Sequence, residues 1–280
     1  DVCSSDLNFF TFCENVGFEE EYVTYANYKK IMHKYKINNL EETEGIIEKQ
    51  RMIKDPEEIE LLQKACQITD DCFKYLKSYI KVGLTEKQIA KEIEQFFIKH
   101  GADDLAFETV VASGKNSSKP HAVPTDKKIE EGDPITIDMG CKYRGYCSDM
   151  TRTIFASYVP EEIKPIYELV LKNQKQVINE LKEGVNLKII SRMVDGDFKL
   201  HGYSLIHALG HGVGLEVHEL PFASTNINFI LKNNMIVTNE PGIYIPNKFG
   251  VRIEDTLIIN QGIATSLTKS EKDYVVVDVK

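Results

Sequence analysis

Two stretches of the chain decide the fold, GLTEKQIAKEIEQFFIKHG at residues 83–101 and GVNLKIISRMVDGDFKLHG at residues 184–202. Each begins with glycine, carries apolar residues at matching positions and ends on His-Gly, and the offset between them is constant without a gap. A repeat of this kind indicates an internal duplication. The sequence therefore predicts two halves related by a pseudo-twofold axis, with a functional site at the seam between them.

Helix pairs and strands surround both stretches. Asp55 and Pro56 fit the N-cap and the first position of one helix. Thr85 and Gln88 form a capping box for the next helix. After each helix pair, alternating apolar residues interrupted by turn residues predict antiparallel strands. We therefore expect an α+β fold of duplicated halves, with an antiparallel sheet covered by helices.

The beginning of the chain differs from the rest. Residues 1–7, DVCSSDL, are encoded by one frame of the sequencing-adapter end GACGTGTGCTCTTCCGATCT, so we expect non-native sequence there, with a natural loop as the alternative. Residues 8–53 hold a helical pattern from Glu19 to Tyr35 and a connector at 46–52, which is too little chain for a comfortable core. The main domain is expected at residues 54–280.

The overall composition is that of an acidic globular protein. The 280 residues carry a formal net charge of −9, which disfavours binding to nucleic acids and anionic membranes. No apolar run approaches the roughly 20 residues that a membrane span needs. The six cysteines form no CxxC pair, so we interpret them as reduced, buried thiols of a cytoplasmic protein.

Two aspartates, Asp138 and Asp149, flank a predicted turn at Arg144-Gly145. In a hairpin with a two-residue loop, we expect this separation to place them directly opposite each other on one face. Facing carboxylates repel unless a cation lies between them or both reach water, and the apolar neighbours of this pair disfavour water. The pattern therefore favours a cation site, with two surface aspartates near a turn as the alternative.

Three further residues extend this candidate site. His211 lies in a glycine-rich stretch, although a buried histidine can also be purely structural. Glu240 stands at a strand end, and Glu254 interrupts an apolar strand, where a buried acid needs a partner. Four carboxylates and one imidazole favour a pair of ions such as Mn²⁺, Co²⁺, Fe²⁺ or Zn²⁺ over a structural zinc site. Two such ions about 3.5–4 Å apart would generate a bridging hydroxide near neutral pH.

Five ordered motifs resemble those of the pita-bread metallopeptidases, which include aminopeptidase P, prolidase and methionine aminopeptidase. They are DMG at 138–140, SDMTRT at 148–153, GHGVG at 210–214, NEPGIY at 239–244 and VRIED at 251–255. The resemblance covers residues 54 to 275 and implies the pita-bread fold, whose two pseudo-symmetric halves agree with the duplication. It also implies a metallo-exopeptidase that holds two divalent metal ions, for which we expect Mn²⁺.

The resemblance assigns metal ligands residue by residue. Asp138 would bind one metal ion, while Asp149 and Glu254 would bridge both. His211 and Glu240 would complete the shell of the other ion, and Glu240 would also accept a proton from the bridging water.

The resemblance also assigns residues to the substrate. His121 would help to stabilise the tetrahedral intermediate or shuttle a proton, and His218 would contact the carbonyl of the scissile bond. His207 and Arg252 resemble residues of the proline-specific branch, and Tyr244 would help to line the pocket on the proline side. Together these residues imply hydrolysis of an Xaa-Pro bond in a peptide with proline at the second position.

The resemblance leaves the exact substrate open. It would be either the N-terminus of a longer peptide, as in aminopeptidase P, or an Xaa-Pro dipeptide, as in prolidase. A methionine aminopeptidase and an inactive pita-bread binding protein are also compatible with the fold, although this chain keeps all five ligands. Residues 51–58 resemble the junction that follows a creatinase-type N-terminal domain. Residues 8–53 would then be a remnant of that domain with its linker, residues 54–280 the catalytic domain, and the full-length protein a homodimer.

Overall fold

The computed structural model describes residues 15–37 and 39–278, which form two compact units that divide between Gln50 and Arg51. The predicted non-native segment, residues 1–7, lies outside the described residues. Within the described ranges, no helix is both long enough and apolar enough to cross a membrane.

The smaller unit pairs two parallel strands beside one helix. Its elements are β1 (Val16–Glu19), α1 (Tyr25–Tyr35) and β2 (Leu40–Thr43), and α2 (Ile46–Arg51) runs across the division between the units. The helix predicted from Glu19 therefore begins only at Tyr25, where Thr24 caps it, because the preceding residues pair with β2. The predicted connector at 46–52 is largely helical.

The first half of the larger unit packs two helices against a sheet of four strands. Its elements are α3 (Pro56–Tyr79), α4 (Glu86–Lys99), β3 (Asp104–Leu105), β4 (Val110–Ser113), the 3-10 helix η2 (Gly114–Ser118), β5 (Pro134–Met139), β6 (Cys141–Tyr143), β7 (Tyr146–Cys147) and β8 (Met150–Ala156). The strand order is β16-β8-β5-β4, in which only β16 (Val276–Val277) is parallel to its neighbour. β3, β6 and β7 form a small antiparallel extension.

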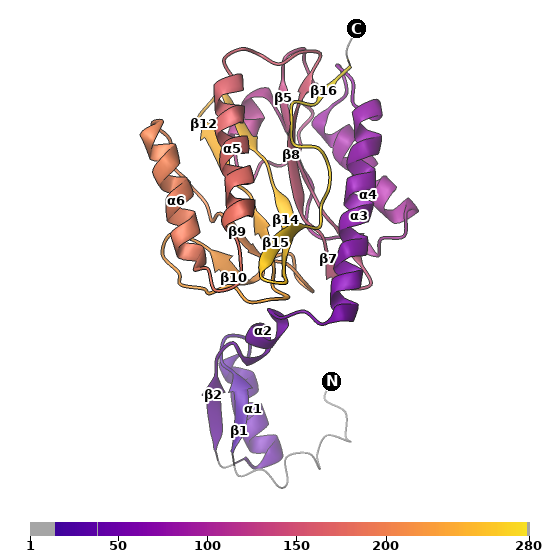
Figure 1. Ribbon diagram of the computed structural model, residues 1–280. Coiled ribbons are helices and arrows are strands. Elements are labelled where there is room, and N and C mark those ends of the chain that lie inside the picture. The colour runs from indigo at the N-terminus through magenta and orange to yellow at the C-terminus, as the bar shows by residue number, and fades with distance from the viewer. Residues whose placement is uncertain (1–14, 38, 279–280) are drawn as a thin grey trace. The chain divides into compact units, whose positions relative to one another are not determined.

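The second half repeats this plan with a sheet of five antiparallel strands. Its elements are α5 (Lys164–Glu180), α6 (Leu187–Leu200), β9 (Gly210–Gly212), β10 (Glu219–Ala223), β11 (Ile236–Asn239), β12 (Gly242–Ile245), β13 (Phe249–Arg252), β14 (Asp255–Asn260) and β15 (Ile263–Ser266). The strand order is β10-β9-β11-β14-β15. In Figure 1, the pair α3 and α4 and the pair α5 and α6 lie on different sides of the molecule, with strands between them.

The predicted duplication is confirmed in detail at the starts of α4 and α6, which contain 14 residues each. Gly83 and Gly184 precede these helices with φ of 93° and 84°, a backbone conformation that glycine adopts without a steric cost. The backbone N–H of Gly83 donates to the carbonyl of Ile129 at 2.9 Å, and Gly184 donates to Leu231 at 2.9 Å. The turn before the helix therefore makes the same hydrogen bond to the corresponding segment in each half.

The central strands of each half also follow one plan. β5 pairs with β8, and β6 with β7 continues this ladder in the same register. β11 pairs with β14, and β12 with β13 continues that ladder likewise. Asp149, Glu240 and Glu254 all lie at the junctions between the inner and outer hairpins.

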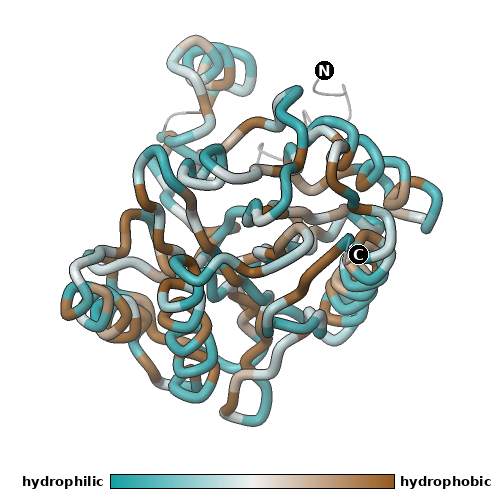
Figure 2. Tube along the Cα trace, turned by 90° about the horizontal axis from the view of Figure 1, so that it is seen from above, coloured by the Kyte–Doolittle hydropathy of each residue, from teal (hydrophilic) through white to brown (hydrophobic). Residues whose placement is uncertain are grey.

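Each half buries an apolar cluster of its own between helices and sheet. The first contains Phe73, Ile93 and other residues of α3, α4, β5 and β8, and the second contains Val170, Phe198 and other residues of α5, α6, β11 and β14. Figure 2 shows the hydrophobic segments concentrated in the strands and the inner sides of the helices. A smaller cluster, which includes Leu62 and Ile236, joins the two halves. The seam between the halves is therefore a packed interface.

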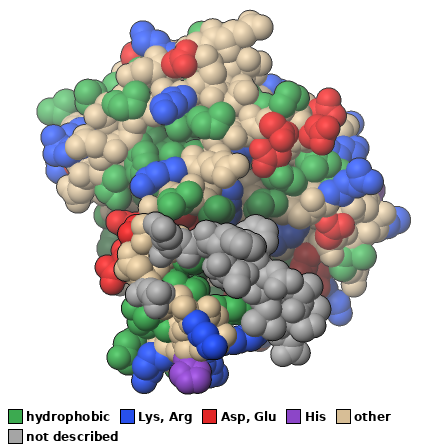
Figure 3. Space-filling view, turned by 90° about the horizontal axis from the view of Figure 1, so that it is seen from below, with side chains coloured by type: hydrophobic (Ala, Val, Ile, Leu, Met, Phe, Trp, Pro, Cys, Tyr) green, Lys and Arg blue, Asp and Glu red, His purple; other side chains and the backbone are tan. Residues whose placement is uncertain are grey.

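Charged side chains of both signs lie on the surface. Figure 3 shows Lys and Arg side chains interspersed with Asp and Glu and with apolar side chains on the face seen from below. An exposed ion pair such as Lys87 with Asp126, at 2.8 Å, contributes about 1 kcal/mol or less. The apolar clusters are therefore the main source of stability.

Candidate metal centre

Five potential metal ligands come from strands that meet at the seam. Asp138 lies in β5 and Asp149 directly precedes β8, both in the first half. Glu240 directly follows β11 and Glu254 directly precedes β14, so the second half supplies a second pair of carboxylates. His211, in β9, adds the imidazole. The duplicated strands thus bring together residues that are up to 116 positions apart in sequence.

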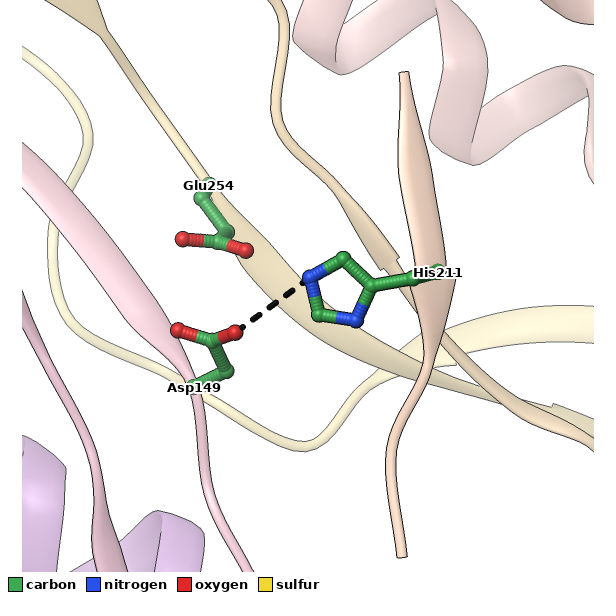
Figure 4. A group of neighbouring side chains, drawn as sticks. All are labelled: Asp149, His211 and Glu254. Carbon is green, nitrogen blue, oxygen red and sulfur yellow. Dashed lines mark ion pairs between the residues drawn. The ribbon is translucent and has the colours of Figure 1, made fainter. Parts of the chain in front are cut away.

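Three of these side chains converge in Figure 4, where Asp149, His211 and Glu254 point toward one another from three different segments. Each offers a ligand atom within 4.8 Å of the others. The Nε2 atom of His211 lies 3.5 Å from Oδ2 of Asp149 and 3.3 Å from Oε1 of Glu240. Nδ1 of His211 lies 3.1 Å from the carbonyl oxygen of Gly212, so Nδ1 donates there and Nε2 faces the carboxylates.

The hydrogen bonding of the carboxylates fits divalent cations. Oδ1 of Asp138 and Oε1 of Glu254 are buried and have no hydrogen-bond partner among the described residues. Their second oxygens do have partners, because Arg252 donates to Asp138 at 2.8 Å and Thr151 donates to Glu254 at 2.7 Å. A buried carboxylate oxygen without a donor is costly, and a metal ion would satisfy it. This donor set, rich in hard oxygens, suits a pair of divalent ions.

The structure corrects the expected placement of Asp138 and Asp149. They do not face each other directly, because Asp138 pairs with Thr151. The predicted turn at Arg144-Gly145 is present, but it lies one residue beyond the midpoint between the two aspartates. Asp149 therefore lies on the same face as Asp138 but diagonal to it.

Burial and mutual repulsion shift the acidity of the carboxyls. Burial, followed by the charge of Glu254, raises the pKa of Asp149 well above its usual range. Burial, followed by the charge of Glu240, does the same to the pKa of Glu254. For Glu240, burial would also raise the pKa, but His211 and His207 beside it lower the pKa to about 2. Positive charge at the centre would relieve this repulsion.

A cavity of about 560 Å³ opens over the ligands. His121 and His218 belong to its wall, together with all five ligands. The rings of His218 and His211 meet edge to face with their centroids 4.3 Å apart, and burial, followed by the charge of His211, lowers the pKa of His218. Both His121 and His218 therefore adjoin the space in which a bound molecule would lie above the ligands.

His207 and Arg252 also line the cavity, whereas Tyr244 lies behind them. Arg252 donates to the hydroxyl oxygen of Tyr244 at 2.6 Å, and that hydroxyl lies 3.0 Å from Nε2 of His207. Nδ1 of His207 donates to the carbonyl of Ala208 at 2.7 Å, so Nε2 accepts from Tyr244. Burial lowers the pKa of His207, in keeping with a neutral ring. Tyr244 therefore does not line the cavity itself but holds Arg252 and His207, which do.

Sequence reasoning missed the side chains that hold the ligands in place. Thr151 supports Glu254, as described above. The hydroxyl of Thr238 accepts from the backbone of His211 at 3.0 Å and lies 3.4 Å from Oε1 of Glu240. Each threonine lies two residues from a ligand in sequence, Thr151 after Asp149 and Thr238 before Glu240, and this spacing was the available signal.

Comparisons with known proteins agree with this geometry. Residues 60–261 match metallopeptidase family M24. A Xaa-Pro dipeptidase of Pyrococcus furiosus is 40% identical over 264 residues, which cover 94% of this chain and 76% of that protein. The solved structure of a Xaa-Pro dipeptidase from Bacillus anthracis superposes with a TM-score of 0.90 at 39% identity, covering 94% of this chain and 75% of that one.

A solved X-Pro aminopeptidase from Thermotoga maritima is also similar, with a TM-score of 0.88 and 34% identity over 94% of this chain and 76% of that one. These matches confirm the resemblance that the five motifs indicated and the α+β pita-bread fold. A family of metallopeptidases also accounts for the buried group of carboxylates and histidine at the seam. The chain belongs to metallopeptidase family M24.

Proposed function

We propose that this protein hydrolyses the peptide bond before proline, and that its preferred substrates are Xaa-Pro dipeptides. The observation that carries the proposal is the buried cluster of Asp149, His211 and Glu254 at the floor of a cavity whose wall contains Arg252. Relatives that share 39–40% of their residues with most of this chain are Xaa-Pro dipeptidases, which supports the choice of substrate.

The five ligands would be divided between two divalent ions. Asp138 would bind one ion, Asp149 and Glu254 would bridge the two, and His211 with Glu240 would complete the other. We favour Mn²⁺ over Co²⁺, Zn²⁺ and Fe²⁺ because carboxylate oxygens outnumber the single imidazole. When bound, such a metal pair supplies Lewis-acid catalysis.

Side chains of the protein would then accept protons and stabilise the negative charge that develops on the substrate. Glu240 lies beside His211 at the floor of the cavity, where its carboxylate would accept a proton from water. His121 and His218 adjoin the cavity, where a ring N–H can donate to the substrate's carbonyl oxygen as negative charge develops on it.

The side of the cavity near Arg252 would receive the proline. A peptide bond before proline has no N–H, so recognition must use the carbonyl group, the pyrrolidine ring and the terminal carboxylate. Hydrogen bonds through Tyr244 hold Arg252 and His207 in place before any substrate arrives. A wall that is ordered in advance lowers the entropic cost of orienting the substrate.

A second candidate is removal of the first residue from longer Xaa-Pro peptides. The X-Pro aminopeptidase of Thermotoga maritima supports it, but at 34% identity it is less similar than the dipeptidases. We also propose that residues 54–280 form the catalytic domain and that the protein acts as a homodimer, which light scattering would measure.

The test is a substrate panel with the whole chain, freed of metal by chelation and reloaded with Mn²⁺, Co²⁺, Zn²⁺ or Fe²⁺ separately. The panel contains Ala-Pro and Leu-Pro, the tripeptide Ala-Pro-Gly, Met-Ala-Ser and the control dipeptide Ala-Ala. We expect Mn²⁺-dependent turnover that is highest with the dipeptides that end in proline. The variant Glu254→Gln should be inactive, while Glu94→Gln, which changes an exposed carboxylate, should match the wild type.

Different results in the same panel would point to different activities. Higher kcat/KM on Ala-Pro-Gly than on Ala-Pro would favour the aminopeptidase, and turnover of Met-Ala-Ser alone would indicate a methionine aminopeptidase. A protein that binds no metal and cleaves none of these peptides would be a binding protein.

A further inference from the structure

Glu86 is a buried carboxylate outside the metal centre. It is the first residue of α4, follows the N-cap Thr85, and has an exposed fraction of 0%. Its sequence position suggests only an acidic residue at the positive end of a helix, where such residues are ordinarily exposed. Complete burial of a carboxylate is expensive unless hydrogen bonds satisfy it.

Hydrogen bonds from one loop satisfy both oxygens of Glu86. Oε1 accepts from the backbone N–H of Ser113 at 2.7 Å and from its hydroxyl at 2.9 Å. Oε2 accepts from the backbone N–H of Thr125 at 2.9 Å and from its hydroxyl at 2.6 Å. The amide of Asn116 lies 3.2 Å and 3.0 Å from the two oxygens. One carboxylate therefore fastens both ends of the segment 113–125 and, through Asn116, the 3-10 helix near its start.

The duplication supplies an internal comparison. Leu187 occupies the position of Glu86 at the start of α6, where it is buried with an exposed fraction of 1%. The backbone contacts at this place are alike, because Glu86 donates to the carbonyl of Lys127 and Leu187 to that of Phe229. An apolar side chain is therefore sufficient to begin this helix, and the carboxylate of Glu86 is available to hold the segment 113–125 of the first half.

That loop forms part of the cavity wall. Residues 120–124 line the cavity, and His121 is among them. No hydrogen bond to the His121 side chain is found within the described part of the chain, so its location depends on the loop backbone. That backbone is fastened at Ser113, Asn116 and Thr125 by Glu86.

We propose that Glu86 is a positioning residue that sets the place of His121 above the metal centre. The proposal rests on the proposed function, because it assigns Glu86 a role in the same hydrolysis. Misplacing a reacting group by about 1 Å can cost roughly 100-fold in rate. Loss of the carboxylate should therefore lower kcat while the metal ligands, which lie on other segments, stay in place.

The first test compares Glu86→Gln with Leu187→Ala, a change at the matching position of the other half. In Glu86→Gln, an amide N–H₂ must face the donors of either Ser113 or Thr125, so one end of the loop is released. We expect kcat for Leu-Pro to fall about 10- to 100-fold, with Mn²⁺ content unchanged. Leu187→Ala should lower thermal stability without changing kcat. Wild-type kcat in Glu86→Gln would overturn the proposal.

A double-mutant cycle separates positioning from general damage. If Glu86 acts through His121, Glu86→Gln should lower kcat no further in a His121→Ala background. Multiplicative losses in the double variant would contradict the proposal. Should Glu86→Gln fail to fold, Thr125→Val takes its place in the cycle with the same expectation; it removes the hydroxyl's contact to the carboxylate together with those from Asn116 and Lys127.

Limited proteolysis measures how accessible the segment 113–125 is, and it needs no Xaa-Pro substrate. Lys115 is an exposed trypsin site inside the segment 113–125, whereas Lys119 precedes Pro120 and is not cleaved by trypsin. We expect trypsin to cut after Lys115 faster in Glu86→Gln than in the wild type or in Leu187→Ala, and equal rates would overturn the proposal. This readout stays valid if the wild type cleaves no Xaa-Pro peptide, so the two failures can be told apart.

Discussion

Oδ2 of Asp149 lies 3.5 Å from Nε2 of His211, although the two residues belong to different halves of the molecule. Neither half alone brings all five ligands to one point, because the first half supplies Asp138 and Asp149 and the second supplies the other three. The centre therefore exists only when the halves are packed together, and metal binding is coupled to the stability of the seam.

Metal affinity should rise with pH. The pKa values of Asp149 and Glu254 are raised, mainly by burial, so the metal-free protein keeps protons that a divalent ion must displace. Affinity should therefore increase between pH 5 and pH 8, by about tenfold per pH unit for each proton released. Calorimetry with Mn²⁺ in buffers of different ionisation enthalpy measures the proton release, and an affinity independent of pH would contradict the assigned shifts.

The variant Glu254→Gln should make the metal-free protein more stable. A carboxyl whose folded pKa is raised binds protons more tightly in the folded state, so it costs stability above its unfolded pKa and costs nothing well below it. Each unit of raised pKa corresponds to about 1.4 kcal/mol. Denaturation after chelation should show a gain in stability at pH 7 that disappears near pH 4, whereas Mn²⁺ should stabilise only the wild type.

Asp255 should be important for the fold, because it is fully buried between two cations. Arg152 lies 2.7 Å from one of its oxygens and Lys272 lies 2.5 Å from the other, and burial, opposed by these charges, leaves its pKa below the usual range. Asp255→Asn should cost about 3–5 kcal/mol, because the two cations are left uncompensated.

The control for this prediction is Asp273→Asn, which removes an exposed ion pair with Lys175 at 3.2 Å. It should change the free energy of unfolding by less than about 1 kcal/mol. Equal losses in the two variants would show that the buried network contributes no more than a surface pair.

Two glycines form a matched pair for backbone effects. Gly196 lies inside α6 and Gly184 precedes it, and an added Cβ would meet no atom within 4 Å at either place. Gly196→Ala should stabilise the protein by about 0.5–1 kcal/mol, since alanine is the better helix former. Gly184 has φ of 84°, so Gly184→Ala should destabilise by about 1 kcal/mol or more. Urea denaturation would measure both, and effects of the same sign would contradict this reasoning.

Local chemistry explains which parts of the fold the sequence predicts. The N-cap at Asp55 and the capping box of Thr85 with Gln88 depend on residues close together in sequence, and both predictions are confirmed. The start of α1 was misplaced because the residues before it pair with β2, which lies beyond the helix and leaves no local signal. The Asp138 register was wrong because one residue of difference in the turn shifts every cross-strand partner.

The same distinction applies to the candidate site. Asp149, Glu240 and Glu254 could be singled out because acids in apolar strands need partners. Glu86 could not, because a glutamate in a first helical turn looks ordinary until a segment 27 to 39 residues away buries it. Residues that position other parts of the site are thus harder to predict from sequence than the metal ligands themselves.

The matched hairpins of the two halves have a consequence for the origin of the molecule. Asp149 and Glu254 occupy corresponding places, each directly before the returning strand of its own half. A half-length ancestor would have carried a pair of acids like the pair that each half now supplies, and two such copies facing each other would bring four carboxylates to one seam. The two halves are no longer equivalent, because the imidazole of His211 stands on one side only.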